Sequence, residues 1–172
     1  MKKLIVLLLI SYSVFQAQTC KRVTDNRTNK PMLIGQGARA DFADSSFSSW
    51  FNEGYKFYKP HFAGKKTLSS KLKNYKIKIV MGTWCSDSRR EVPAFYKVLD
   101  ELQYPTDKVN LVFVNRKLKA PGVDKKKENI TNVPTIIVSQ KGKEVGRIVE
   151  SPINTLESDL SDILNNKKSE MK

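Results

Sequence analysis

Large apolar residues recur at helical spacing in three segments of this chain. The first segment carries Phe47, Trp50, Phe51, Tyr55 and Tyr58 at such positions. The other two carry Val92, Phe95, Tyr96, Leu99 and Leu102, and then Ile153, Leu156, Leu160, Ile163 and Leu164. This spacing is typical of amphipathic helices that bury one face. It predicts three helices, and Leu68 with Leu72 predicts a short additional one.

Short runs of apolar, mostly β-branched residues alternate with these helices. Residues 77–81 and 109–114 flank the helix that is expected to begin at Ser86. A strand, a helix and a strand of these lengths predict a right-handed unit with two parallel strands. Residues 135–138 and 144–149 surround a turn that contains glycine, and they predict an antiparallel hairpin. The fold class is therefore predicted to be α/β, with a central mixed sheet flanked by helices.

The start of the chain has the pattern of an export signal. Lys2 and Lys3 precede the apolar run 4–10, which is far shorter than the roughly 20 residues that cross a bilayer. We expect residues 1–17 to be a cleaved signal peptide. The alternatives are an uncut anchor and a lipoprotein that is attached to the membrane through Cys20. All three place the body outside the cytoplasm, and we expect an exported, periplasmic protein.

The length of 172 residues suits a single domain. Residues 18–45 are expected to form an N-terminal arm, polar and loop-like as far as residue 31, with a short strand at 32–34. Residues 46–166 are expected to form the domain itself, which begins with N-terminal helices. Residues 167–172 are expected to be a frayed basic tail.

Composition excludes several functional classes. Lys and Arg number 31 against 17 Asp and Glu, so the formal net charge is +14. The basic residues are scattered without interleaved aromatic residues, and we interpret them as solvated faces rather than a nucleic-acid surface. Two cysteines and the single His61 exclude a Cys/His zinc finger, and a Gly-x-Ser-x-Gly hydrolase motif is absent. We expect no metal, no cofactor and a monomer.

The clearest chemical signal is the sequence Trp-Cys-Ser-Asp-Ser at residues 84–88, where a strand is expected to end and a helix to begin. The unpaired N–H groups and the dipole of a helix start stabilise a thiolate, so Cys85 is predicted to be reactive. Ser88 lies one turn further, and its hydroxyl is predicted to face the sulfur. Arg89 is expected to favour the thiolate and Asp87 to oppose it. The alternative is a buried, inert cysteine.

These residues give the chain a resemblance to the thioredoxin-like family over residues 68–166. The Trp-Cys-x-x-Ser motif at 84–88 follows an apolar strand, and Pro93 matches the proline that kinks the active-site helix of the family. Residues 133–135, Val-Pro-Thr, look like its segment with a cis proline that faces the active-site cysteine. The chain also resembles exported thioredoxin-like proteins of Bacteroidetes-type bacteria. The resemblance implies a thioredoxin-like fold with an N-terminal helical extension.

The resemblance also implies a substrate site. Trp84, Val133 and Pro134 become the candidate substrate-binding residues beside the catalytic candidates Cys85 and Ser88. The implied partners are protein or small-molecule thiols and disulfides in the cell envelope. Nucleic acid is not an expected partner, and a membrane is one only if the chain is lipidated.

Ser88 departs from the family because it stands where a dithiol enzyme has its resolving cysteine. Ile79 likewise stands where thioredoxins bury an aspartate. We therefore predict a monothiol protein in which Cys85 forms mixed disulfides, with isomerase-like or deglutathionylase-like exchange. The alternative is a non-catalytic binding module for a polypeptide. Whether Cys20 supplies the missing thiol stays open at this point, because spacing does not show whether the two sulfurs meet.

Overall fold

The computed structural model describes residues 20–165 of the chain. The strands are β1 (Lys21–Thr24), β2 (Pro31–Gly37), β3 (Lys76–Met81), β4 (Asn110–Phe113), β5 (Thr135–Gln140) and β6 (Lys143–Val149). The helices are α1 (Ser45–Phe57), α2 (Lys65–Leu72), α3 (Ser86–Glu101) and α4 (Leu156–Leu164), with the 3-10 turns η1 (Arg39–Ala43) and η2 (Thr106–Lys108). The predicted signal peptide at 1–17 and basic tail at 167–172 lie outside the described residues.

The six strands form one mixed sheet in the order β1-β2-β4-β3-β5-β6. Strands β3 and β4 are parallel, with Ile79 opposite Leu111, and α3 connects them. Strand β5 is antiparallel to both β3 and β6. The predicted α/β class, the parallel pair and the hairpin are confirmed. The predicted helices are present, two of them before β3, although their description as an extension of a thioredoxin-like domain stays a prediction.

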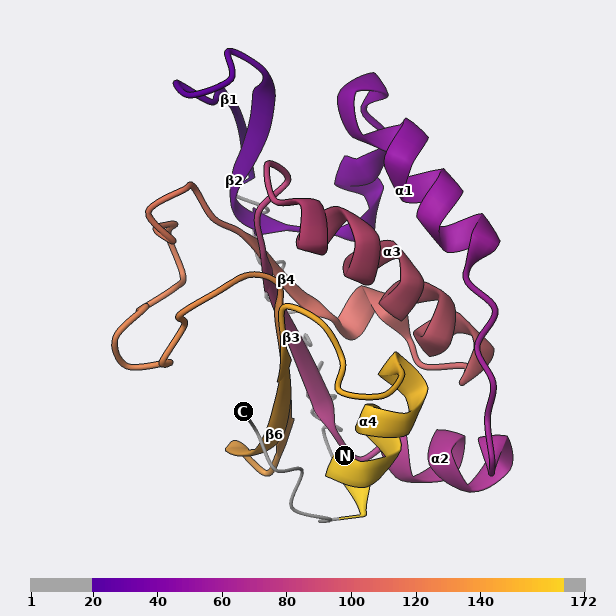
Figure 1. The fold of residues 1–172 in the computed structure, drawn as a ribbon. Helices are drawn as coiled ribbons and strands as arrows, with labels where there is room; N and C mark the ends of the chain where they lie inside the picture. The colour runs from indigo at the N-terminus through magenta and orange to yellow at the C-terminus, as the bar shows by residue number, and fades with distance from the viewer. Residues whose placement is uncertain (1–19, 166–172) are drawn as a thin grey trace, which may run out of the picture.

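The sheet has two differently covered faces (Figure 1). Ile77, Ile79 and Met81 of β3 point to one face of the sheet, and Val80 points to the other. The first three join the helix-side cluster, which also contains the buried apolar residues of α1, α2, α3 and α4. The second cluster, called here the loop-side cluster, contains Val80, Val114, Leu118, Ile130, Val133 and Ile137. Helices therefore cover one face, and the segment between β4 and β5 covers the other.

Helix α1 packs against α3 where Gly54 of α1 meets Pro93 of α3. Pro93 lies inside α3, where it removes an amide donor and kinks a helix. Gly54 of α1 faces it, because a Cβ at Gly54 would lie 3.1 Å from Pro93 Cγ. At the start of α1, the Asp44 side chain accepts a hydrogen bond from the Ser46 amide at 2.8 Å, which is an N-cap interaction. These contacts fix the helix layer beside the start of α3.

Within the range 18–31, predicted to be loop-like, residues 21–24 form a strand instead, and residues 25–30 form a turn. Strand β1 pairs with β2 in an antiparallel hairpin, with Lys21 opposite Ile34. The hairpin turn is held by Asp25, whose backbone carbonyl accepts the Asn29 amide at 2.8 Å and whose side chain accepts the Thr28 hydroxyl at 2.7 Å. The sequence pattern did not reveal β1 because an exposed edge strand needs no apolar alternation; only Val23 is partly buried.

Among residues 20–165, none of the helices combines the length and the apolar character that a bilayer crossing requires.

Candidate functional site

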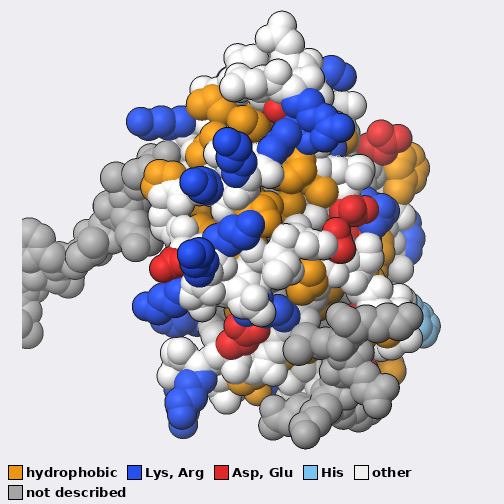
Figure 2. Space-filling view, turned by 60° about the vertical axis from the view of Figure 1, so that its left-hand side comes forward, with side chains coloured by type: hydrophobic (Ala, Val, Ile, Leu, Met, Phe, Trp, Pro, Cys, Tyr) orange, Lys and Arg blue, Asp and Glu red, His pale blue; other side chains and the backbone are white. Residues whose placement is uncertain are grey.

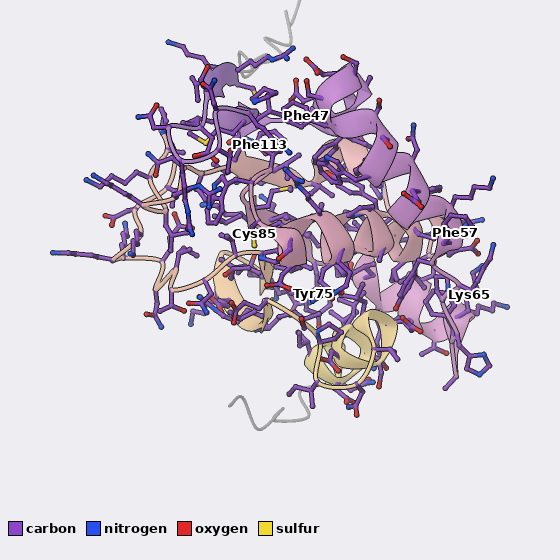
Figure 3. All side chains as sticks on the ribbon, turned by 45° about the horizontal axis from the view of Figure 1, so that its top comes forward. Phe47, Phe57, Lys65, Tyr75, Cys85 and Phe113 are labelled. Atoms are coloured by element: carbon purple, nitrogen blue, oxygen red, sulfur yellow. The ribbon has the colours of Figure 1, made fainter. Side chains whose placement is uncertain are left out.

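Cys85 lies at the N-terminus of α3, as predicted (Figure 3). A tight turn joins β3 to this helix, and in it the Cys85 amide donates to the Gly82 carbonyl at 2.9 Å. Gly82 is required here because a Cβ would lie 2.5 Å from the indole of Trp84. Trp84 and Cys85 are both half-buried. The thiol is therefore accessible in part and lies beside the unpaired amides of the first helical turn.

The segment that precedes β5 completes the site. The Cys85 thiol donates to the Val133 carbonyl, with 3.1 Å between Sγ and the oxygen, and the Val133–Pro134 peptide bond is cis. The Pro134 carbonyl accepts the Glu150 amide at 2.8 Å, which ties the segment to the residue after β6. The structure thus brings Cys85, Trp84, Val133 and Pro134 together at one end of the sheet.

Ser88 has a structural role in this geometry. It is fully buried, and its hydroxyl oxygen accepts the Gly82 amide at 3.3 Å. No hydrogen bond joins Ser88 to Cys85 within the part of the chain that the structure describes. Ser88 therefore anchors the turn that carries the cysteine, and its expected contribution to the sulfur stays a prediction.

The two residues predicted to tune the thiolate are engaged elsewhere. Arg89 donates from Nε to the Thr83 carbonyl at 2.6 Å, and its guanidinium lies 5.7 Å from the ring centroid of Trp50. Asp87 forms an ion pair with Arg90 at 2.9 Å. Within residues 20–165, neither Arg89 nor Asp87 makes a hydrogen bond to the Cys85 sulfur.

Arg116, a cation that the sequence analysis did not single out, lies against Trp84. The guanidinium of Arg116, which follows β4, stands 4.8 Å from the ring centroid of Trp84. The pKa of Arg116 is raised, first by hydrogen bonding to Asp25 and in smaller part by the negative charges of Asp25 and of the Cys85 thiolate. Partial burial acts in the opposite direction. The interaction with Cys85 is the smallest of these contributions to the pKa of Arg116.

Asp25 holds Arg116 in this position. Its side chain is almost fully buried, and it accepts from Nε at 2.9 Å and from a terminal guanidinium nitrogen at 2.8 Å. The hydrogen bonds from Arg116 and then from Thr28 hold the pKa of the Asp25 carboxyl well below its usual range. Asp25 and Arg116 are 91 positions apart, so local sequence patterns contain no signal for this pair.

Cys20 lies in a different environment. It is half-buried and packs against the helix-side cluster, whereas Cys85 packs against the loop-side cluster. Burial, followed by the negative charge of Asp41, raises the pKa of the Cys20 thiol to about 11. Both cysteines are free. The structure does not bring Cys20 to Cys85, so Cys20 is not placed to act as the resolving thiol.

Metal ligands do not gather at this site. Within residues 20–165, no group of three or more His, Cys, Asp and Glu side chains is arranged to hold a metal ion.

Comparison with known proteins shows similarity of structure without detectable similarity of sequence. No protein-family model matches the chain, and no curated protein matches it. A protein of unknown function from Pseudomonas aeruginosa, PA1234, has a TM-score of 0.52 at 14% identity, covering 76% of this chain and 91% of that one. This similarity concerns the fold alone.

Thioredoxins are also among the structural neighbours. Mitochondrial thioredoxin 3 from Saccharomyces cerevisiae has a TM-score of 0.39 at 20% identity, covering 63% of this chain and 98% of that one. Thioredoxin O2 from Arabidopsis thaliana has a TM-score of 0.37 at 18% identity, covering 59% and 86%. The chain is an α/β protein, and these two matches, like the first, are similarities of structure alone.

Proposed function

We propose that this protein carries out thiol–disulfide exchange through a single thiol, that of Cys85. The observation that carries the proposal is the position of the Cys85 sulfur at the start of α3, 3.1 Å from the Val133 carbonyl. A helix start favours the thiolate, which is the attacking form. The guanidinium of Arg116 lies 4.8 Å from the ring centroid of Trp84, the residue that precedes Cys85.

The exchange proceeds in two balanced steps. The Cys85 thiolate attacks one sulfur of a partner disulfide, a new S–S bond forms, and the other partner sulfur leaves as a thiolate. A second thiolate then attacks the mixed disulfide and releases Cys85. This thiolate belongs to the partner in isomerisation, and to a small thiol such as glutathione in deglutathionylation. Ser88 has no thiol, and Cys20 lies against the other cluster, so release depends on a thiol from outside the chain.

Trp84, Val133 and Pro134 form the proposed surface for the partner. Val133 and Pro134 are buried, so the segment that they form offers a partner little side-chain surface. An extended partner segment lying along it would present its sulfur to Cys85. The predicted export signal at residues 1–17 completes the proposal: the protein would act on thiols and disulfides in the periplasm, where disulfides persist.

A second candidate function is a binding module without catalysis. Ser88 favours it, because the hydroxyl is buried against the Gly82 amide and the chain has no resolving thiol at this position. In that case the surface at Val133 and Pro134 would hold a polypeptide, and Cys85 would at most tether it.

Reduction of a glutathionylated peptide by excess glutathione distinguishes the two functions. We expect the wild-type protein to accelerate the reaction, Cys85→Ser to lose this acceleration, and the matched control Cys20→Ser to retain it. Mass spectrometry should detect the mixed disulfide on Cys85. Equal rates for wild type and Cys85→Ser would contradict the exchange function, and peptide binding that survives in Cys85→Ser would then support the binding module.

A further inference from the structure

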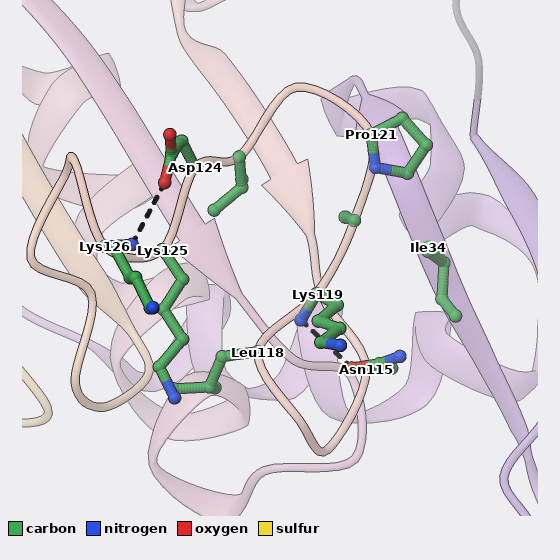
Figure 4. A pocket seen from close by; sticks show the side chains of 10 residues that line it. Ile34, Asn115, Leu118, Lys119, Pro121, Asp124, Lys125 and Lys126 are labelled. Atoms are coloured by element: carbon green, nitrogen blue, oxygen red, sulfur yellow. Dashed lines mark hydrogen bonds between the residues drawn. The ribbon is translucent and has the colours of Figure 1, made fainter.

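The segment between β4 and β5, residues 115–131, contains a hollow that the exchange chemistry does not explain. The hollow has a volume of about 760 Å³. Its apolar floor contains Leu118, Ala120 and Val123, with Ile34 contributed by β2 (Figure 4). Its rim carries lysines, including Lys119 and Lys125. This size is within the range of pockets that bind small ligands or a few side chains.

The floor of the hollow and the thiol site rest on the same apolar cluster. Leu118 belongs to the loop-side cluster together with Val133, and Ala120 and Val123 pack against this cluster. Trp84 and Cys85 pack against the same cluster. One apolar cluster therefore supports both the hollow and the sulfur, so a partner whose cysteine meets Cys85 has its neighbouring residues close to the hollow.

The rim is strongly basic. Residues 115–131 contain six basic and two acidic residues. Of the basic ones, Arg116 is paired with Asp25. The remaining five are exposed and form no ion pair within residues 20–165: Lys117, Lys119, Lys125, Lys126 and Lys127. Figure 2 shows Lys and Arg side chains gathered around exposed apolar ones on this side of the molecule.

The two acidic residues of the segment do little to offset this charge. Glu128 forms an ion pair with Lys78 of β3. Asp124 accepts hydrogen bonds from the backbone amides of Lys126 and Lys127, both at 3.1 Å, so its carboxylate is directed into its own turn. The lysine ammonium groups are thus available to a negatively charged partner.

The segment is held in place before any partner arrives. The Asn115 side chain accepts the amides of Lys117 and Lys119 at 2.9 and 3.0 Å. Arg147 of β6 donates to the carbonyls of Glu128 and Asn129 at 3.1 and 3.0 Å. A rim fixed in this way loses little conformational entropy when it binds a partner.

We propose that this hollow binds the acidic residues that flank the reactive cysteine of a polypeptide substrate. The inference rests on the proposed function and names its substrate class: disulfides or mixed disulfides within acidic peptide segments. The apolar floor accommodates the stems of one or two side chains, and the lysines attract carboxylates. Such charge complementarity acts chiefly on the association rate, and it weakens as salt rises.

Three peptides test the proposal. Each carries one cysteine as a mixed disulfide with thionitrobenzoate, flanked by Glu, Gln or Lys. The Cys85 thiolate attacks the peptide sulfur and the S–S bond breaks. Coloured thionitrobenzoate leaves because it is the thiol of lower pKa. We expect the wild-type protein to react with the Glu peptide about tenfold faster than with the Gln peptide, and this preference to vanish at 1 M salt.

Charge reversal locates the preference. The double variant Lys125→Glu/Lys126→Glu should lose the preference for the Glu peptide and keep the Gln-peptide rate. The matched control Lys141→Glu/Lys143→Glu changes two exposed lysines, one in the β5–β6 turn and one at the start of β6, and should keep the preference. A preference that is absent from the wild type, unaffected by salt or equally lost in the control would overturn the proposal.

Two further outcomes separate this inference from the function on which it rests. If no peptide reacts faster with wild type than with Cys85→Ser, the exchange function itself fails. If all peptides react equally through Cys85, while vesicles rich in phosphatidylglycerol bind wild type and not the Lys125→Glu/Lys126→Glu variant, the rim binds a membrane and the peptide proposal fails alone.

Discussion

Cys85 and Cys20 carry the same thiol group on opposite faces of one sheet. Cys85 begins a helix, donates to a backbone carbonyl at 3.1 Å and lies near the charge of Arg116. Cys20 is half-buried against the helix-side cluster and lies near the negative charge of Asp41, so the pKa of its thiol is raised to about 11. The two thiols therefore differ in their surroundings, and we predict from this difference that Cys85 is the more reactive of the two.

The comparison extends to the elements that support each cysteine. The Cys85 turn is fixed by contacts from three separate parts of the chain: Ser88 of α3, Val133 before β5, and the β1–β2 hairpin acting through Arg116. Cys20, by contrast, immediately precedes β1, an edge strand. A site that must hold a sulfur in one geometry is thus supported from several directions.

Alkylation should show the largest difference between the two cysteines. At pH 8 only about a thousandth of Cys20 is thiolate if its pKa is about 11, so iodoacetamide should modify Cys85 at least about a hundredfold faster. The Cys20 rate should rise about tenfold for each pH unit up to pH 11. Mass spectrometry of the alkylated peptides measures both rates. In urea, where the protein is unfolded, the two cysteines should be alkylated at similar rates, which is the control. Similar rates in the folded protein would contradict the predicted difference in reactivity between Cys85 and Cys20.

A second thiol at position 88 tests whether Cys85 acts as a single thiol. We expect Ser88→Cys to raise insulin reduction in the presence of dithiothreitol at least about tenfold, because a thiol one helical turn from Cys85 releases the mixed disulfide within the chain. Ser88→Ala, which removes the bond to the Gly82 amide, is the control and should bring no gain. Wild-type turnover equal to that of a dithiol thioredoxin would contradict the monothiol mechanism.

The ion pair between Asp25 of the β1–β2 hairpin and Arg116 should contribute to the thermal stability of the protein. Arg116→Ala leaves the Asp25 carboxylate buried without its partner, which is more harmful than removing both charges. We expect its thermal midpoint to fall by several degrees, and the double variant Asp25→Ala/Arg116→Ala to recover part of that loss. Equal thermal midpoints for Arg116→Ala and wild type would show that the pair makes no net contribution to stability.

Acid unfolding should reveal the same pair through its pH dependence. The pKa of Asp25 is lowered by folding, chiefly by Arg116, so its contribution to stability is present above the unfolded pKa of about 3.9. The contribution is lost as pH falls below that value toward the folded pKa. Wild type should therefore lose more thermal stability than Asp25→Asn between pH 4 and pH 2. Parallel acid curves for the two proteins would contradict this assignment.

Sequence patterns predicted the parts of the molecule that depend on local periodicity. The helical spacing of Phe95 and Leu99 predicts α3, and the position of Cys85 follows from the strand before it. The edge strand β1 was missed because its residues are mostly exposed. The Asp25–Arg116 pair joins residues 91 positions apart, and no local pattern encodes such a contact. The direction of the Ser88 hydroxyl depends on the turn geometry, which sequence does not specify.

Substitution of Trp84 should have the smallest effect, and it tests how Arg116 is positioned near Cys85. Its indole nitrogen donates to the Val114 carbonyl at 2.8 Å, and its ring lies under the Arg116 guanidinium. Trp84→Phe keeps an aromatic ring for Arg116 but leaves the carbonyl without this donor, which costs about 0.5–1.5 kcal/mol of unfolding free energy. Urea denaturation measures that loss, and Cys85 alkylation should change less than twofold. Trp84→Ala removes the ring as well and should slow alkylation further, because Arg116 loses the surface on which it rests. Equal alkylation rates for the two variants would show that the aromatic ring does not position the cation near Cys85.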